Sequence, residues 1–448
     1  MDKQNDCQIC AGKNIIFPNG EKKIEEAFVE MRVRVGTLLK TDNVSFLLGS
    51  GTSIVAGGVL FSSFPKQIEM VLLKRGISKK GKRASGWLKL FYKTIQIITG
   101  TTIDIPNRYS QYTSIPPSAK IKAIGVNFET YLSRLYGWLE CMTGDVVMLK
   151  LPDQNQVRIN KKTLAKLIKE IVNTLTSVMN LALCKDGDTA LRCSHRRFIR
   201  KILTRPLNLR RVNIFTLNYD TLIEQATDAE GAVLVDGFVG SLQRVFRPES
   251  YDLDFYFPAQ TTEGRVHRFD RAIHLYKLHG SINWHKCDQS WENPYGLYAA
   301  LYNANCSQDD TLIYPTPLKY GQVLGVPYSE MFRRFGNAIA QSQSVLFVIG
   351  YGFGDDHVNS LIRQSLAVPS VTIVVVDPTP KSEFLKQLES LGDERVWVIK
   401  GQEAGAFEKF VENVLPDLKD EEIEWKVVQT FQKLDPKATN KLEDSNGK

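Results

Sequence analysis

A short apolar run that ends in two closely spaced glycines constrains this chain more than any other feature. Residues 44–53 read Val-Ser-Phe-Leu-Leu-Gly-Ser-Gly-Thr-Ser. The apolar part is short enough for one buried strand, and glycine lets the backbone turn sharply and approach a ligand closely. If a helix follows Gly51, its free N–H groups would face a pyrophosphate, and Thr52 and Ser53 would add hydroxyl donors. An ordinary strand-to-helix turn is the alternative, because the third glycine of the full dinucleotide-binding motif is absent.

Composition and cysteine usage favour a soluble protein of the cytoplasm. The chain has 448 residues, of which 43% are hydrophobic and 24% charged, and no apolar run reaches the length of a membrane span. Residues 1–20 are polar and show no secretory signal. Seven cysteines in such a chain predict reduced thiols, and the pair Cys7 and Cys10 has no second pair at zinc-binding spacing. We therefore expect neither a membrane segment nor a metal site.

The positive charge is concentrated in two segments. A net charge of +8 is modest for this length, so it leaves direct nucleic-acid binding open. Segments 74–93 and 192–211 are rich in Lys and Arg and contain no acidic residue. Either segment could contact an anionic surface or a partner, although solvated helix faces are the simpler explanation.

The order of strand and helix signals predicts a parallel sheet interrupted by a long insertion. Helices are expected at 21–40, from about 127, at 161–183 and from about 221. Strands are expected at 44–48, 212–217, 273–278, 345–349, 371–376 and 395–399. Continuous apolar strands that alternate with helices indicate a parallel sheet covered on both faces. We therefore predict an α/β, Rossmann-like fold with a large helical insertion.

This reading divides the chain into four parts. They are an N-terminal mobile arm and helix (1–43), a Rossmann domain (44–59 and 204–415), a helical insertion (60–203) and a charged C-terminal tail (416–448) that is expected to fray. The polar motifs all follow predicted strands. They should therefore lie at the carboxyl edge, where open α/β sheets bind ligands.

Four such motifs occur in order. They are Gly-Ser-Gly-Thr-Ser (49–53), Thr-Leu-Asn-Tyr-Asp (216–220), Lys-Leu-His-Gly-Ser-Ile-Asn-Trp (277–284) and Gly-Tyr-Gly-Phe-Gly-Asp (350–355). As a set they resemble the sirtuin-like family, most closely its bacterial branch of antiphage-defence NAD⁺ hydrolases. The first is similar to the sirtuin Gly-Ala-Gly-x-Ser loop, the second to Thr-x-Asn-x-Asp, and the third to the His-Gly motif that holds the catalytic base. The resemblance spans about residues 44–400, and no motif covers 60–200.

The resemblance implies that NAD⁺ is the substrate, with no further cofactor, and that Asn218, His279 and Asp220 are catalytic. The residues implied to bind NAD⁺ are Gly49, Ser50, Gly51, Thr52, Ser53, Gly350, Tyr351, Gly352, Asp355 and Asp377. Cleavage of the nicotinamide–ribose bond needs a group that orients water or ribose hydroxyls and a base near neutral pH. Asn218 suits the first task and His279 the second. From the residues alone, Asn218 could instead cap a helix, His279 could be a core histidine, and Asp377 could cap a turn.

Two departures from the sirtuin pattern argue against deacylation. Only Cys287 and Cys306 lie between the His-Gly motif and the later glycine-rich loop, whereas a zinc ribbon needs four ligands. The loop that clamps an acyl-lysine peptide also has no recognisable counterpart. The resemblance to the bacterial branch implies NAD⁺ glycohydrolysis in abortive infection, and we expect this activity to need no metal. A protein deacylase, an ADP-ribosyltransferase and a non-catalytic NAD or ADP-ribose sensor are the alternatives.

Control of this activity implies an assembly. An unrestrained NAD⁺ hydrolase would deplete its own cell, so its activity must depend on a signal or on association. We expect a homo-oligomer, because symmetric self-association is common among soluble enzymes. A candidate docking partner for it is a DNA-translocating ATPase. The basic segments 74–93 and 192–211 are the expected contacts.

Overall fold

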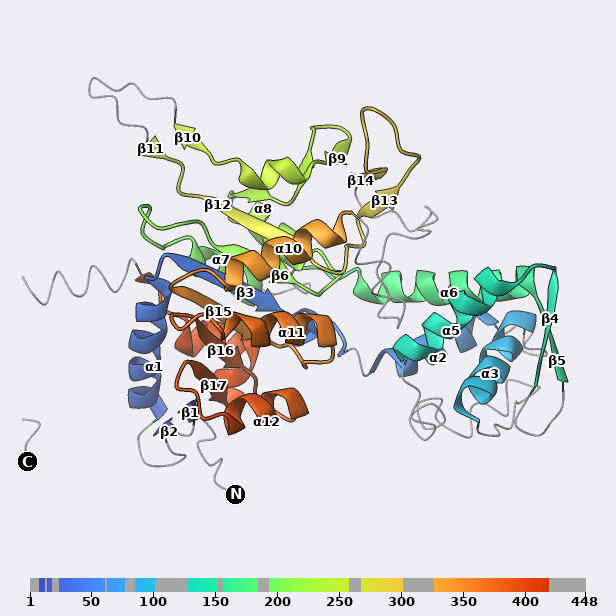
Figure 1. Ribbon diagram of the computed structural model, residues 1–448, viewed down its shortest axis with the longest axis horizontal. Helices are drawn as coiled ribbons and strands as arrows, with labels where there is room; N and C mark the ends of the chain where they lie inside the picture. The colour runs from blue at the N-terminus through green and yellow to red at the C-terminus, as the bar shows by residue number, and fades with distance from the viewer. Residues whose placement is uncertain are drawn as a thin grey trace, which may run out of the picture.

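The computed structural model places a nine-stranded sheet with helices on both faces beside a separate helical module (Figure 1). This arrangement confirms the predicted α/β, Rossmann-like fold. The structure describes residues 8–12, 14–17, 24–60, 63–76, 85–100, 128–150, 156–183, 193–257, 267–300 and 326–418. The C-terminal tail expected after residue 415 lies outside the described residues beyond Leu418.

Seven parallel strands form the body of the sheet, in the order β17-β16-β15-β3-β6-β12-β7. They are β3 (Asn43–Leu48), β6 (Asn213–Thr216), β7 (Val233–Val235), β12 (Ala272–Lys277), β15 (Ser344–Ile349), β16 (Thr372–Val376) and β17 (Val396–Lys400). The chain builds outward from β3 in one direction and returns to build outward from β15 in the other. Ligands of open α/β sheets bind at such a reversal of strand order. The β3–β15 pair therefore marks the expected site.

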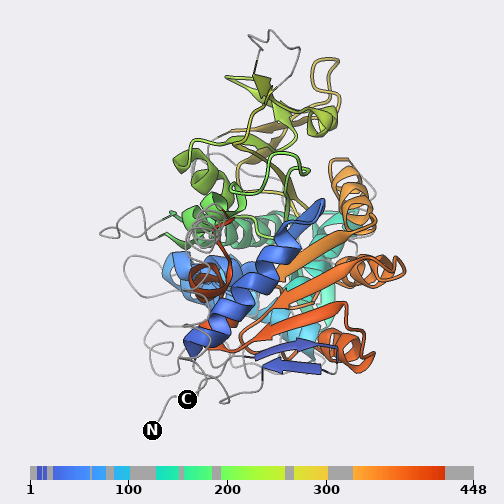
Figure 2. The ribbon, with the colours of Figure 1, turned by 90° about the vertical axis from the view of Figure 1, so that its left-hand side faces the viewer.

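The N-terminal residues extend the sheet, in contrast to the mobile arm expected from the sequence. Strands β1 (Gln8–Ala11) and β2 (Asn14–Phe17) add in antiparallel fashion to the edge at β17, where Ile9 pairs with Ile399. Figure 2 shows the two strands at this edge of the sheet. Ile9 is fully buried, and the backbone N–H of Gly12 donates to the carbonyl of Val396 at 3.0 Å. The free hydrogen-bonding edge of β17 explains why so short a segment is ordered.

Helices cover the two faces of the sheet with separate hydrophobic clusters. One face carries α1 (Ile24–Leu39), α7 (Ser194–Ile202), α8 (Leu222–Ala229) and the short C-terminal turns α13 (Gln402–Gly405), α14 (Phe407–Lys409) and η6 (Phe410–Val414). The other carries α10 (Tyr328–Ile339), α11 (Asp356–Ser365) and α12 (Glu383–Ser390). Along β3, Phe46 packs on the first face and Leu47 on the second. This alternation is what a strand buried on both faces requires.

Many charged side chains of the basic segment 192–211 contact other parts of the protein, and its role as a contact surface stays a prediction. Helix α7 from this segment packs on the sheet through Phe198 and Ile199, although the sequence placed it at the end of the insertion. Its charged side chains reach internal acceptors. Arg196 and Arg200 pair with Glu230, Lys201 donates to the carbonyls of Val411 and Leu415, Arg205 donates to the carbonyls of Leu39, Thr41 and Arg210, and Arg211 pairs with Asp254.

The helical module has a hydrophobic core of its own. It contains α2 (Phe64–Gly76), α3 (Gly86–Thr99), α5 (Phe128–Cys141), the hairpin β4 (Val146–Lys150) and β5 (Gln156–Asn160), and α6 (Lys161–Met179). Leu132 and Leu135 are buried, as their helical spacing predicts, whereas the hairpin was not expected. Asn160 begins α6 by accepting a hydrogen bond from the backbone N–H of Lys162 at 2.9 Å.

Short strands at the β7 end of the sheet complete the structure. A four-stranded sheet contains β8 (Phe238–Val239), β9 (Arg244–Phe246), β13 (Trp284–Lys286) and β14 (Leu297–Ala299), with the turn η5 (Pro248–Asp252) beside it. Strands β10 (Tyr256–Phe257) and β11 (His267–Arg268) form a small hairpin. None of the described helices combines the length and the hydrophobicity that a membrane span requires.

Candidate functional site

The loops after β3 and β15 are joined directly at the point where the strand order reverses. The backbone N–H of Gly49 donates to the carbonyl of Ile349 at 3.0 Å, and that of Gly51 donates to the carbonyl of Gly350 at 2.9 Å. The first loop continues into a 3₁₀ helix, η1 (Ser50–Ala56), which begins one residue before Gly51, whereas a helix was expected after it. The first and fourth motifs therefore meet at one place.

The close contact between these loops explains their glycines better than a bound phosphate does. A Cβ atom on Gly49 would lie 2.5 Å from the carbonyl oxygen of Gly350, and one on Gly51 would lie 2.7 Å from the Cα of Gly350. The N–H of Thr52 is also used, because it donates to the carbonyl of Gly49 at 3.0 Å. The N–H groups of Gly51 and Thr52 therefore bind the protein's own backbone, and phosphate binding by the rest of the loop stays a prediction.

The side chain of Asn218 connects the second motif to the glycine loop. Its Nδ2 lies 2.9 Å from the carbonyl of Gly49, 3.1 Å from Thr52 Oγ1 and 3.0 Å from Ser53 Oγ. A backbone carbonyl can only accept, so this contact fixes which end of the amide is nitrogen. Helix α8 begins at Leu222, after Thr221. The structure therefore excludes the alternative that Asn218 caps this helix.

Asp220 extends the same network from the other end of the motif. Its Oδ2 accepts a hydrogen bond from Ser53 Oγ at 2.6 Å, and its Oδ1 accepts one from the backbone N–H of Leu222 at 3.1 Å. The carboxylate is buried, and both of its oxygens are engaged. Ser53 thus lies between the side chains of Asn218 and Asp220.

His279 is buried and paired with a carboxylate from the fourth motif. Its Nε2 lies 3.1 Å from Oδ2 of Asp355, while Oδ1 of Asp355 accepts a hydrogen bond from the backbone N–H of His357 at 3.0 Å and so caps α11. A carboxylate in this position fixes the orientation of an imidazole ring and stabilises its charged form. The sequence assigned Asp355 to NAD⁺ binding. In the structure its carboxylate holds His279.

The second and third motifs are tied together by their backbones. The N–H of Ile282 donates to the carbonyl of Tyr219 at 3.0 Å, and the hydroxyl of Ser281 donates to the same oxygen at 3.3 Å. The rings of Tyr219 and His279 lie 6.3 Å apart. These contacts place the loops of Asn218 and His279 side by side.

A cavity of about 70 Å³ opens beside Asn218. Its polar surface comes from the glycine loop and the second motif, and its aliphatic walls come from elsewhere. The lining residues are Ser50, Ser53, Gly58, Val59, Val178, Met179, Leu181, Leu217, Asn218, Tyr219 and Asp220. Sequence reasoning missed the walls, because residues 58–59 and 178–181 form no motif and reach the site only through the fold. The end of α6 therefore brings the helical module to the candidate site.

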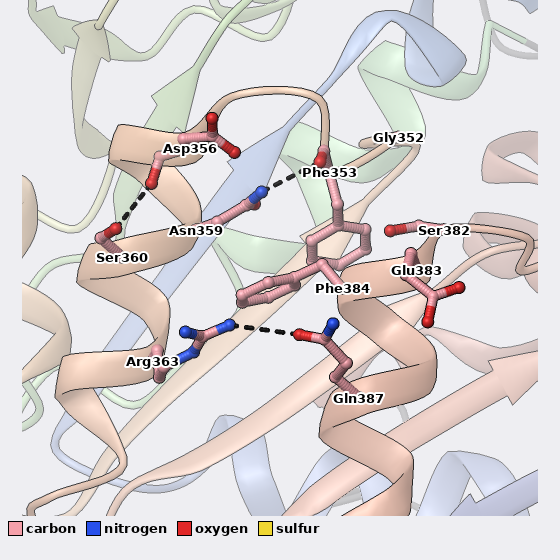
Figure 3. Close-up of a pocket in the computed structure, with 10 residues that line it drawn as sticks. All are labelled: Gly352, Phe353, Asp356, Asn359, Ser360, Arg363, Ser382, Glu383, Phe384 and Gln387. Atoms are coloured by element: carbon pink, nitrogen blue, oxygen red, sulfur yellow. Dashed lines mark hydrogen bonds between the residues drawn. The ribbon is translucent and has the colours of Figure 1, made fainter.

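A second, larger cavity of about 530 Å³ lies between α11 and α12, beside the glycine-rich loop (Figure 3). Gly352 and Phe353 line it at the loop, and the ring of Phe353 stacks on that of Phe384 with a centroid distance of 5.5 Å. Phe353 has a φ of 55°, an uncommon conformation for a bulky residue. A Cβ on Gly352 or Gly354 would meet nothing within 4 Å. Internal packing does not require these two glycines, so the loop backbone is open to close approach.

Asp377 was expected either to bind the adenosine ribose or to cap a turn, and in the structure it caps a turn. Its Oδ1 accepts a hydrogen bond from the backbone N–H of Thr379 at 2.8 Å. Burial raises the pKa of this carboxyl above its usual value. Any role for Asp377 in ribose binding stays a prediction.

Within the part of the chain that the structure describes, no group of three or more His, Cys, Asp or Glu residues is arranged to hold a metal ion. Cys287 is exposed, whereas Cys7 and Cys306 lie outside the described residues. Metal-independent cleavage stays a prediction.

A known protein family matches the part of the chain that contains three of the four motifs. Residues 212–394 match the family described as the SIR2-like domain. The match includes the motifs of Asn218, His279 and Asp355 but not the glycine loop at 49–53, and it supports a sirtuin-like family and chemistry that involves NAD. A search of curated proteins finds no match to the chain.

Proposed function

We propose that the protein is an NAD⁺ glycohydrolase, which cleaves the bond between nicotinamide and ribose and releases nicotinamide and ADP-ribose. The observation that carries the proposal is that two functional side chains are held by the two loops that meet at the reversal of strand order. Asn218 is fixed on the glycine loop, and His279 is held by Asp355 on the adjoining loop. The SIR2-like domain supports NAD as the substrate.

The small cavity suits the nicotinamide end of NAD⁺. At about 70 Å³ it is well below the roughly 300–1,000 Å³ of sites that enclose a whole drug-sized ligand, so it can take only one end of a dinucleotide. Aliphatic walls from Val59, Met179 and Leu181 match a flat ring, and the Asp220 carboxylate has lone pairs left to accept a hydrogen bond from its carboxamide. The rest of NAD⁺ would extend over the open glycine-rich loop near Gly352.

The proposed reaction needs few groups from the protein. As the glycosidic bond breaks, its electron pair moves to the nicotinamide nitrogen and neutralises the positive charge there, while an oxocarbenium-like centre forms on the ribose. Because Nδ2 of Asn218 is bound to the glycine loop, its Oδ1 is the atom that can orient water or a ribose hydroxyl. Water then attacks the ribose carbon, and its proton passes to His279. Asp355 keeps the imidazole in place and stabilises the charge it acquires.

Product analysis separates this proposal from its alternatives. Purified full-length protein is incubated with NAD⁺, with and without an acyl-lysine peptide, and His279→Ala serves as the control. We expect equal amounts of nicotinamide and free ADP-ribose in both reactions. Acyl-ADP-ribose made only with peptide would indicate a deacylase, and ADP-ribose attached to protein would indicate a transferase. NAD⁺ binding without turnover would favour a sensor.

The wider role is proposed from the sequence resemblance. We infer that NAD⁺ depletion makes the protein an effector of antiphage defence, that it acts as a homo-oligomer, and that a DNA-translocating ATPase is its partner. The internal contacts of segment 192–211 weaken its assignment as a docking surface. In segment 74–93, residues 77–84 lie outside the described part of the chain, and this segment stays a predicted contact.

Two kinds of glycine should respond differently to alanine. Gly352→Ala adds a methyl group where nothing lies within 4 Å, so we expect an unchanged melting temperature and weaker NAD⁺ binding if the substrate crosses this loop. Gly51→Ala places its methyl 2.7 Å from the Cα of Gly350 and should lower the free energy of unfolding by about 1–3 kcal/mol. Calorimetric binding and thermal unfolding measure the two effects. Unchanged NAD⁺ affinity in Gly352→Ala would remove this loop from the binding site.

A further inference from the structure

The buried side chain of Lys277 makes two contacts with the chain segment that contains Asp220 and Glu224. Lys277 is the last residue of β12 and is 2% exposed. Its Nζ donates to the backbone carbonyl of Asp220 and lies 2.8 Å from Oε1 of Glu224, in the first turn of α8. Lysine is almost never fully buried unless it is paired, because removing an ammonium group from water costs several kcal/mol. The position of this residue therefore needs an explanation.

We propose that Lys277 is a positioning residue that holds the loop of Asn218 and Asp220 against the glycine loop. This inference rests on the proposed function. Stability alone does not explain the arrangement, because a buried ion pair is often no more stabilising than apolar side chains of similar volume. Lys277 could pair with Glu224 without also donating to the carbonyl of Asp220. This additional hydrogen bond fixes the Asp220 carbonyl where the chain turns from the second motif into α8.

The contacts around Asp220 show how this bond reaches the site. The same residue whose carbonyl binds Lys277 uses its carboxylate to bind Ser53 and the N–H of Leu222. Ser53 in turn lies 3.0 Å from the amide of Asn218. A shift of the main chain at Asp220 would move its carboxylate as well, and would therefore change the positions of Ser53 and of the Asn218 side chain. Displacement of a positioned group by about 1 Å can lower a rate by about 10²-fold.

Glu224 makes it possible to separate positioning from charge pairing. Burial raises the pKa of this carboxyl, and the neighbouring Lys277 opposes that rise. Lys277→Met alone leaves Glu224 buried without its cation and should destabilise the protein. The double variant Lys277→Met/Glu224→Gln leaves neither charge. Glu224→Gln alone keeps the bond between Lys277 and the carbonyl of Asp220.

The test compares the three variants with the wild type in urea unfolding and in steady-state NAD⁺ cleavage. We expect Lys277→Met to lower both the unfolding midpoint and kcat. The double variant should regain most of the midpoint while its kcat stays at least about tenfold low and its KM changes little. Glu224→Gln should keep most of its kcat. Recovery of kcat together with stability in the double variant would overturn the proposal, because the pair would then be structural only.

Failure of the proposed function is distinguished by a second measurement. If the wild type does not cleave NAD⁺, that function is wrong, and positioning is read from hydrogen exchange instead. Relative to each variant's own global free energy of unfolding, backbone amides of residues 217–222 should lose more protection from exchange in the double variant than in Glu224→Gln. Equal exchange in this segment would overturn the positioning role independently of any activity.

Discussion

Replacement of Asn218 or His279 by alanine is expected to lower the rate of NAD⁺ cleavage by a factor of about 10² or more. Each variant removes one positioned group and leaves the sheet untouched, because both residues follow strands and do not lie within them. Asn218→Ala loses hydrogen bonds to the glycine loop, at a cost of about 1–3 kcal/mol in stability. His279→Ala leaves Asp355 still capping α11. Rates from quenched-reaction product analysis and unfolding curves of the same preparations measure both effects.

His285→Ala is the matched control for this pair. His285 is also a buried histidine, six residues further along, but it lies on β13 and stacks on Tyr298. Its loss should reduce stability and leave the turnover of the folded protein close to normal. A similar fall in turnover for His285→Ala would show that the assay reports folding. Near-normal turnover in Asn218→Ala or His279→Ala would remove that residue from the mechanism.

The central strands could be predicted from the sequence because their pattern is local. Each of β3, β15 and β16 is a continuous apolar run between polar turns, which is typical of parallel strands buried on both faces. The strands β1, β7 and β9 carry no such signal, since each has only three or four residues and gains its stability by pairing with neighbouring strands. Such short strands depend on the rest of the fold, so their own residues do not specify them.

For the site, the sequence could predict which residues lie at the sheet edge but not what each one contacts. Gly49 and Gly51 were expected to make room for a phosphate, whereas both are needed for contact with Gly350, about 300 positions later in the chain. Asp355 was expected to bind substrate, and it binds His279. In each case the partner comes from a distant segment, which residue spacing along one strand or turn cannot reveal.

The helical module is held to the candidate site by residues that are distant from it in the sequence. Tyr219 and Ile282, from the motifs of Asn218 and His279, are buried in the hydrophobic core of the module and not in the cores of the sheet. Their backbones are joined by a hydrogen bond of 3.0 Å. The two loops of the site therefore serve as the anchor of the module. Packing in the module and geometry at the site should change together.

Ile282→Ala should consequently lower the free energy of unfolding by about 2–5 kcal/mol, with Ile282→Val costing only about 0.5–1.5 kcal/mol. Ile282 is 1% exposed, so the alanine variant leaves a cavity in the hydrophobic core that the His279 loop shares with the module. We expect faster hydrogen exchange in residues 161–179 and a higher KM for NAD⁺, because Val178 and Met179 at the end of α6 line the small cavity. Urea unfolding, exchange measured by mass spectrometry and steady-state kinetics test the three effects. A destabilised Ile282→Ala protein with unchanged exchange in α6 would show that the module is held by other contacts, and its link to the site would then be lost.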